Sequence, residues 1–259
     1  MECAFGDREL NLALLSGVEL FFSLLIVVAA STVIGTVGFG FSLVAAPVLL
    51  FYLEPQQVVV VANSLIALLM IMVLARTWNN LEFKASLGLV LGGMAATPIG
   101  VLALNSASPS VLRITIAIMI IFLGLFSLKN VQLPLVQSKV AGPVFGFLTS
   151  LAVTTIAIGG PLGAIYSISQ RWKPDMVRAS LALFFLACDL LAFPLYAATG
   201  LVEKDTMANI GMLIPGLIIG FFVARMVIIW INERIFRYVV VAVIVVAGSV
   251  TLIREFSRV

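Results

Sequence analysis

Two glycine-rich runs are the residues of this chain best suited to hold a small ligand. The first reads Gly35-Thr36-Val37-Gly38-Phe39-Gly40, and the second reads Thr154-Thr155-Ile156-Ala157-Ile158-Gly159-Gly160-Pro161. Glycine and proline disrupt helices. A helix that resumes after such a break presents free backbone N–H groups and the positive end of its dipole, which favours an anion. The two runs therefore predict a binding site for a small oxyanion.

Polar groups in and near both runs would form the shell around this anion. Glycine exposes its N–H to a ligand because it has no side chain. The predicted substrate-binding residues are Gly38, Phe39, Gly40, Ser42, Asn63, Ser64, Thr154, Thr155, Gly159, Gly160 and Ser180. Such a cage of neutral donors needs no full positive charge. For Ser64 and Ser180, helix packing or hydrogen bonds to their own backbone are the alternative role.

Composition places these residues in a membrane. The 259 residues are 62% hydrophobic and 10% charged, with a mean hydropathy of +1.21. Soluble domains have about 25% charged residues, so we expect an all-α polytopic membrane protein with one transmembrane domain over 1–259. The chain has no histidine, and its two cysteines, Cys3 and Cys188, are far apart. We therefore expect no enzyme, no metal site and no cofactor.

Two uncharged stretches, 20–53 and 140–170, are too long for single membrane helices. As one helix, the first would be about 50 Å long, against a hydrocarbon core of about 30 Å. Each stretch contains one of the glycine-rich runs. We therefore predict that each forms two shorter helices joined by irregular backbone inside the membrane, as a broken helix or a re-entrant hairpin. Two ordinary helices that meet in a tight turn at the membrane edge are the alternative.

Basic residues indicate the orientation. If each long stretch counts as two segments, the chain has ten segments, and an outside N-terminus places ten of the fifteen basic residues in the cytoplasm. This cytoplasmic set is Arg76, Lys84, Lys129, Lys139, Arg171, Lys173, Arg178, Arg225, Arg234 and Arg237.

The chain also contains an internal repeat. Residues 112–116 are similar to 236–240, and 62–65 are similar to 178–181. The two halves, about 12–128 and 138–254, would each hold five segments, so that the second enters the membrane from the opposite side. Inverted repeats with broken helices characterise secondary transporters, which bind their substrate near the midplane. Duplication within a structural membrane protein is the alternative.

Two charged residues of the segment from 174 to 201 could act on such a site. Asp189 lies deep in this segment, and a carboxylate inside a membrane is costly and marks a functional candidate. It is a candidate to carry the proton of a coupled transport cycle. The alternative is that Pro194 nearby marks a kink or the outer edge of the membrane. Arg178 could attract anions from the cytoplasm, or could be a topology signal whose charged end reaches the interface.

In its motifs the chain resembles the TauE/SafE sulfite exporter family. The run from Gly35 to Ser42 is similar to the family's glycine signature, residues 61–65 stand where it has an A-T-S-L run, and 96–100 resemble its P-x-x-x-G pattern. The second half matches at 159–161 and 178–181, and through Pro215-Gly216 with Gly220. Phe39, Phe41 and Asn63 depart from the family pattern and leave the identity of the substrate open.

The resemblance implies a secondary transporter in the bacterial inner membrane. The expected partners are the lipid bilayer and a small sulfur-containing anion, such as sulfite, a sulfonate like sulfoacetate, or thiosulfate, with no nucleic acid. Alternating access would operate around a midplane site built from the two broken helices. The direction of transport, the coupling ion and the oligomeric state stay open. The alternatives are a transporter of another small organic anion and a non-transport structural subunit, which would have no polar cavity between its halves.

Overall fold

The computed structural model describes residues 14–126 and 140–227, which form helices and no strands. Five of the described helices are long and apolar enough to cross a membrane. These are α2 (Gly17–Val37), α4 (Pro55–Thr77, continued by the 3₁₀ turn η1, Trp78–Asn80), α5 (Phe83–Ser106), α9 (Pro174–Ala198) and α10 (Lys204–Val227). The others are α3 (Phe41–Leu49), α6 (Pro109–Phe126), α7 (Ala141–Ile156) and α8 (Gly160–Ser169). The predicted all-α polytopic membrane fold is confirmed.

Some of the sequence-based expectations fall outside the described residues. They concern Cys3, the basic residues Lys129, Lys139, Arg234 and Arg237, and the repeat residues 236–240. The first and last residues of the two predicted halves, 12–128 and 138–254, also lie outside the described residues.

Both glycine-rich runs interrupt the helices. α2 ends at Val37, and Gly38 and Gly40 then adopt left-handed backbone with φ of 94° and 101°. α7 ends at Ile156, Ala157 has a φ of 59°, and α8 begins at Gly160. Left-handed backbone strains residues that have a Cβ atom, so the two glycines suit the first break.

After each break the short helix folds back along the longer one. α3 packs on α2 and α8 packs on α7, and a Cβ atom on Gly163 of α8 would lie 3.5 Å from Thr149 Cγ2 of α7. Each interrupted stretch is therefore a helical hairpin.

The first hairpin is unequal. α2 has 21 residues and α3 has 9, so the stretch 20–53 does form two shorter helices, although α2 alone, at about 32 Å, is as long as the hydrocarbon core. The helix continues through Gly35, which packs closely against α10: a Cβ atom there would lie 2.8 Å from Ala224 Cβ.

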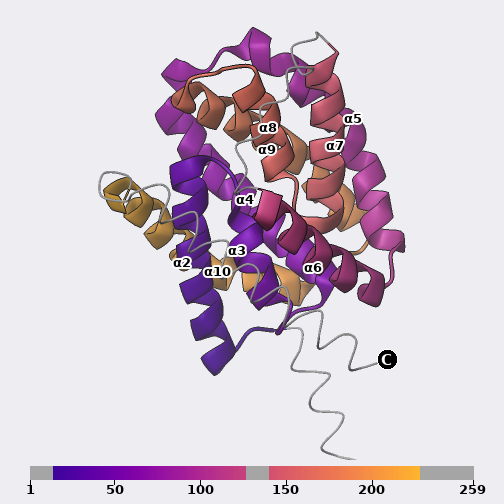
Figure 1. The fold of residues 1–259 in the computed structure, drawn as a ribbon. Helices are drawn as coiled ribbons and strands as arrows, with labels where there is room; N and C mark the ends of the chain where they lie inside the picture. The colour runs from indigo at the N-terminus through magenta and orange to yellow at the C-terminus, as the bar shows by residue number, and fades with distance from the viewer. Residues whose placement is uncertain (1–13, 127–139, 228–259) are drawn as a thin grey trace, which may run out of the picture.

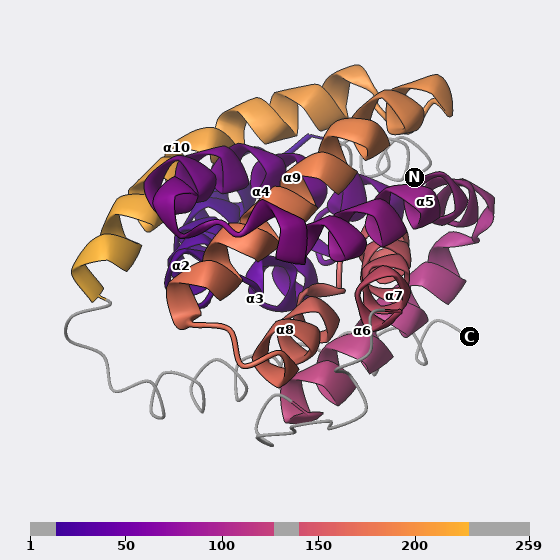
Figure 2. The ribbon, with the colours of Figure 1, turned by 90° about the horizontal axis from the view of Figure 1, so that it is seen from above.

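The long helices form two close pairs around a central pair. α4 and α9 pack side by side in the middle of the molecule, α2 packs on α10, and α5 packs on α7 (Figures 1 and 2). The buried residues of α4 include Val58, Val59, Val60 and Val61. Because α3 and α8 fold back toward this centre, both breaks are brought next to the central helices.

Candidate functional site

The two breaks meet, although they are far apart in the sequence. A Cβ atom on Gly160 would lie 2.8 Å from Phe39 Cβ and 3.5 Å from the Gly40 nitrogen. The first residue of α8 therefore rests directly on the backbone that links α2 to α3. Three of the predicted binding residues, Phe39, Gly40 and Gly160, are thus neighbours.

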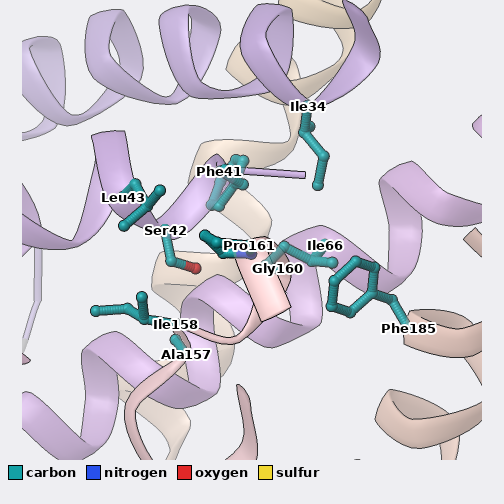
Figure 3. A pocket seen from close by; sticks show the side chains of 11 residues that line it. Ile34, Phe41, Ser42, Leu43, Ile66, Ala157, Ile158, Gly160, Pro161 and Phe185 are labelled. Carbon is teal, nitrogen blue, oxygen red and sulfur yellow. The ribbon is translucent and has the colours of Figure 1, made fainter. Parts of the chain in front are cut away.

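A small cavity of about 20 Å³ lies at this contact, with room for one water-sized molecule. Gly40, Phe41 and Ser42 line it from the first break, and Gly160 and Pro161 from the second (Figure 3). Its apolar sides include Ile34 of α2, Ile66 of α4 and Phe185 of α9. An anion with three oxygens needs more space, so the breaks must separate to admit one.

Ser42 gives this cavity its polar side chain. It is 3% exposed, and its hydroxyl has no hydrogen-bond partner. It lies in the first turn of α3, where the N–H groups of Phe41, Ser42 and Leu43 precede the intrahelical hydrogen bonds, and no side chain caps this helix. The start of α3 therefore offers three backbone donors and one hydroxyl next to the cavity.

The start of α8 offers fewer donors. No side chain caps it, but Pro161 has no N–H, and the Leu162 N–H already donates to the Gly159 carbonyl oxygen at 2.9 Å. The Gly160 N–H is its available donor. The two breaks thus contribute unequally to the cavity.

Four other predicted hydroxyl groups are engaged elsewhere, and none of them lines the cavity. Ser64 donates to the Val60 carbonyl, Thr154 to the Ser150 carbonyl and Thr155 to the Gly100 carbonyl, at 2.7, 2.8 and 3.2 Å, whereas Ser180 accepts a 2.7 Å bond from Ser86. Ser64 therefore bonds to its own backbone, and Ser180 bonds across a helix contact, as in the alternative role considered for both.

The remaining two glycines border the breaks without lining the cavity. A Cβ atom on Gly38 would lie 3.3 Å from Arg178 Cγ, and Gly159 lies against the Thr149 carbonyl. Arg178 pairs with Asp175 at 3.0 Å, so a basic side chain stands at the edge of the first break.

Asn63 belongs to a buried polar network at the end of α7. Its amide nitrogen donates to the Val153 carbonyl and to the Tyr196 hydroxyl, both at 3.0 Å, and that hydroxyl donates to the Thr154 carbonyl at 2.8 Å. The Asn63 side-chain oxygen is buried without a partner. The network ties α4 and α9 to the last turn of α7, just before the second break.

Tyr196 is a residue that sequence reasoning did not select. Its spacing from Asp189 could have identified it, because it lies seven residues later on the same face of a helix. A tyrosine in a long apolar helix otherwise indicates the membrane interface.

Replacing Tyr196 by Phe should lower the stability of the protein by about 1–3 kcal/mol, because the buried Thr154 carbonyl loses its donor and the Asn63 amide loses one acceptor. Thermal unfolding of the purified protein in detergent measures this. The matched control is Tyr52→Phe, at a half-buried tyrosine outside the network. Equal unfolding temperatures for both variants would contradict the role of the network.

Asp189 is buried deep in α9 and is only 3% exposed. Within the described part of the chain, neither of its carboxyl oxygens has a hydrogen-bond partner. It shares one face of the helix with Phe185, a residue of the cavity wall, and with Tyr196. Along α9, Asp189 therefore lies between a residue of the cavity wall and a member of the network at the second break.

One comparison with known proteins gives a match. The family model described as Sulfite exporter TauE/SafE matches residues 23–251, a range that includes both breaks. No curated protein and no solved structure matches the chain.

Proposed function

Because the chain belongs to the sulfite exporter TauE/SafE family, and is therefore a multi-pass membrane transporter rather than an enzyme, we propose that it carries a small sulfur-containing anion, such as sulfite, a sulfonate or thiosulfate. The anion would bind where the two breaks meet. The observation that carries this proposal is the unpartnered, buried Ser42 hydroxyl next to the uncapped start of α3.

The chemistry of the cavity suits an oxyanion. The N–H groups of the first turn of α3 lie at the positive end of the helix dipole, which favours an anion. The Ser42 hydroxyl can rotate to donate a hydrogen bond to an oxygen of the anion. Ile34, Ile66 and Phe185 surround these donors with apolar groups, which strengthens each hydrogen bond by excluding water. Among the residues that the structure describes, no basic side chain lines the cavity, so binding stays weak enough for release.

The arrangement of the helices supports transport by alternating access. We infer that the halves are inverted repeats, in which α2–α3 correspond to α7–α8, α4 to α9 and α5 to α10. The contacts fit this correspondence, because α2 packs on α10 just as α7 packs on α5. Rocking of one half against the other would then open the junction to each side in turn. We place the N-terminus outside, in a bacterial inner membrane.

Reconstitution in liposomes tests the proposed function. We expect saturable uptake of labelled sulfite, a sulfonate such as sulfoacetate, or thiosulfate, and no saturable uptake of a carboxylate of similar size. Preference for the carboxylate would favour a transporter of another organic anion. Folded protein that transports none of these anions would refute the proposal and favour a structural subunit.

Replacing Ser42 by Ala should weaken binding of the anion about 10- to 150-fold, since a hydrogen bond to a charged group contributes about 1.5–3 kcal/mol. The concentration of anion that gives half-maximal uptake measures the effect. Ser31→Ala is the matched control, because the Ser31 hydroxyl is also buried and unpartnered but does not line the cavity. If the two variants weaken binding equally, Ser42 does not contact the anion.

A further inference from the structure

We propose that Asp189 binds the proton that drives transport, so that the protein moves its anion and a proton together in the same direction. The inference rests on the proposed function and adds a coupling ion to it. Its basis is the position of Asp189, whose carboxyl group is buried without a hydrogen-bond partner among the described residues. On one face of α9 it lies between Phe185 of the cavity wall and Tyr196 of the network.

Among the described residues, no charged group neutralises Asp189. The elements packed against α9 are α4, α5, α7, α8 and η1. Their ionisable residues are Arg76 at the end of α4, Lys84 at the start of α5, and Tyr166 of α8. On α9 itself, Arg178 pairs with Asp175 more than two turns away, and the nearest ionisable groups are Cys188 and Tyr196. A proton is the simplest cation that could neutralise the carboxylate there.

The distance to the cavity makes the charge of Asp189 matter for the anion. Phe185 lines the cavity and precedes Asp189 by one helical turn, and residues so spaced on a helix lie about 6 Å apart. An ionised carboxylate one helical turn from a cavity-wall residue, in an apolar interior, repels an anion, whereas a protonated one does not. The proton and the anion therefore favour each other's binding, and this coupling is reciprocal.

The network connects the same helix, α9, to the second break. Tyr196 lies two turns beyond Asp189 and donates to the Thr154 carbonyl in the last turn of α7. The Asn63 side chain bonds both Tyr196 and the Val153 carbonyl. A shift of α9 at Asp189 is thus transmitted to the backbone that must move when the two breaks separate.

The charges balance over the proposed cycle. The proton adds to one carboxylate oxygen of Asp189 on the side where the anion enters, and it leaves from that oxygen on the side where the anion is released. For a monovalent anion, the loaded protein has the same net charge as the empty protein. Neither crossing then moves an extra charge through the bilayer, where charge is costly.

The experiment separates coupling from transport. Liposomes that contain the wild-type protein should accumulate a labelled monovalent sulfonate about tenfold under a gradient of one pH unit, as expected for one proton per monovalent anion, and should also exchange labelled for unlabelled anion without a gradient. Asp189→Asn should lose the accumulation and keep the exchange. A pH-sensitive dye inside the liposomes should report proton entry with the anion in the wild type and none in the variant.

Two further variants make the result interpretable. Glu203→Gln removes an exposed carboxylate between α9 and α10 and should accumulate anion like the wild type, and Asp189→Glu should restore part of the accumulation. Gel filtration and thermal unfolding verify that each variant is folded.

Three results would overturn the proposal. They are full gradient-driven accumulation by Asp189→Asn, loss of exchange as well as accumulation in a folded variant, and accumulation in the wild type that follows a sodium gradient instead. Absence of exchange in the wild type is a different result, because it refutes the proposed function itself.

Discussion

Replacing Gly160 by Val should reduce transport about 5- to 150-fold while the protein stays folded. The first added carbon would lie 2.8 Å from Phe39 Cβ, which is closer than side-chain carbons pack, and the two methyl groups would extend into the cavity that Gly160 lines. Such overpacking costs about 1–3 kcal/mol, a range that corresponds to this loss of rate. The added side chain destabilises the state in which the two breaks touch.

Initial rates of uptake of the labelled anion in liposomes measure the loss. Gly211→Val is the matched control, because a Cβ atom at Gly211 of α10 has nothing within 4 Å. Gly160→Ala should lie between the wild type and the valine variant. Rates at the wild-type level for folded Gly160→Val would show that the anion does not pass through the junction of the breaks.

The same glycines illustrate what could be predicted from the sequence. The breaks followed from simple physics, because an uncharged stretch of more than 30 residues exceeds the membrane thickness, and a glycine-rich run in it is the cheapest place to interrupt a helix. The residue at which the first break begins could not be predicted in this way. Gly35 stays helical because it allows α10 to approach α2, and such a tertiary contact overrides the local preference.

The candidate site was predictable in its backbone and less so in its side chains. Gly40 and Gly160 meet, and Ser42 faces their cavity. Ser64 and Thr154, by contrast, bond to the carbonyl four residues earlier, which is always available to a hydroxyl in a helix. The rotation of a helix in a membrane protein cannot be inferred from polarity when its segments are apolar on every side.

The network around Asn63 and Tyr196 could not be predicted for a related reason. Its members come from α4, α7 and α9, and each bond depends on the packing of helices that are distant in the sequence. Asp189 was selected without this information, because a buried carboxylate stands out by its cost alone.

The largest loss of stability is expected for Gly92→Leu in the contact between α5 and α7. A Cβ atom on Gly92 would overlap the carbonyl oxygen of Pro143, and one on Gly146 would overlap that of Leu89. Because the overlapping atoms belong to the backbone, no side-chain rotation relieves the clash, and the helices must separate. We expect a cost of more than about 3 kcal/mol, beyond the usual range for overpacking.

Gel filtration in detergent and thermal unfolding should reveal this loss as aggregated protein or a strongly lowered unfolding temperature. Gly211→Leu is the control for adding the same side chain to an open helix face. Gly88→Ala is a milder test, because its Cβ atom would lie 3.1 Å from a side-chain carbon of Pro143. A stable, monodisperse Gly92→Leu protein would mean that α5 and α7 do not pack this closely.

The contact between α2 and α10 is as close as the one between α5 and α7. A Cβ atom on Gly220 would overlap the carbonyl oxygen of Val28, so Gly220→Leu should be as destabilising as Gly92→Leu if the two halves correspond. Between helices in lipid, close packing through small residues replaces the hydrophobic effect as the force of association. Each of these two contacts joins a helix of one half to a helix of the other. Glycines there should therefore decide whether the protein folds, whereas Gly160 should decide whether the folded protein transports.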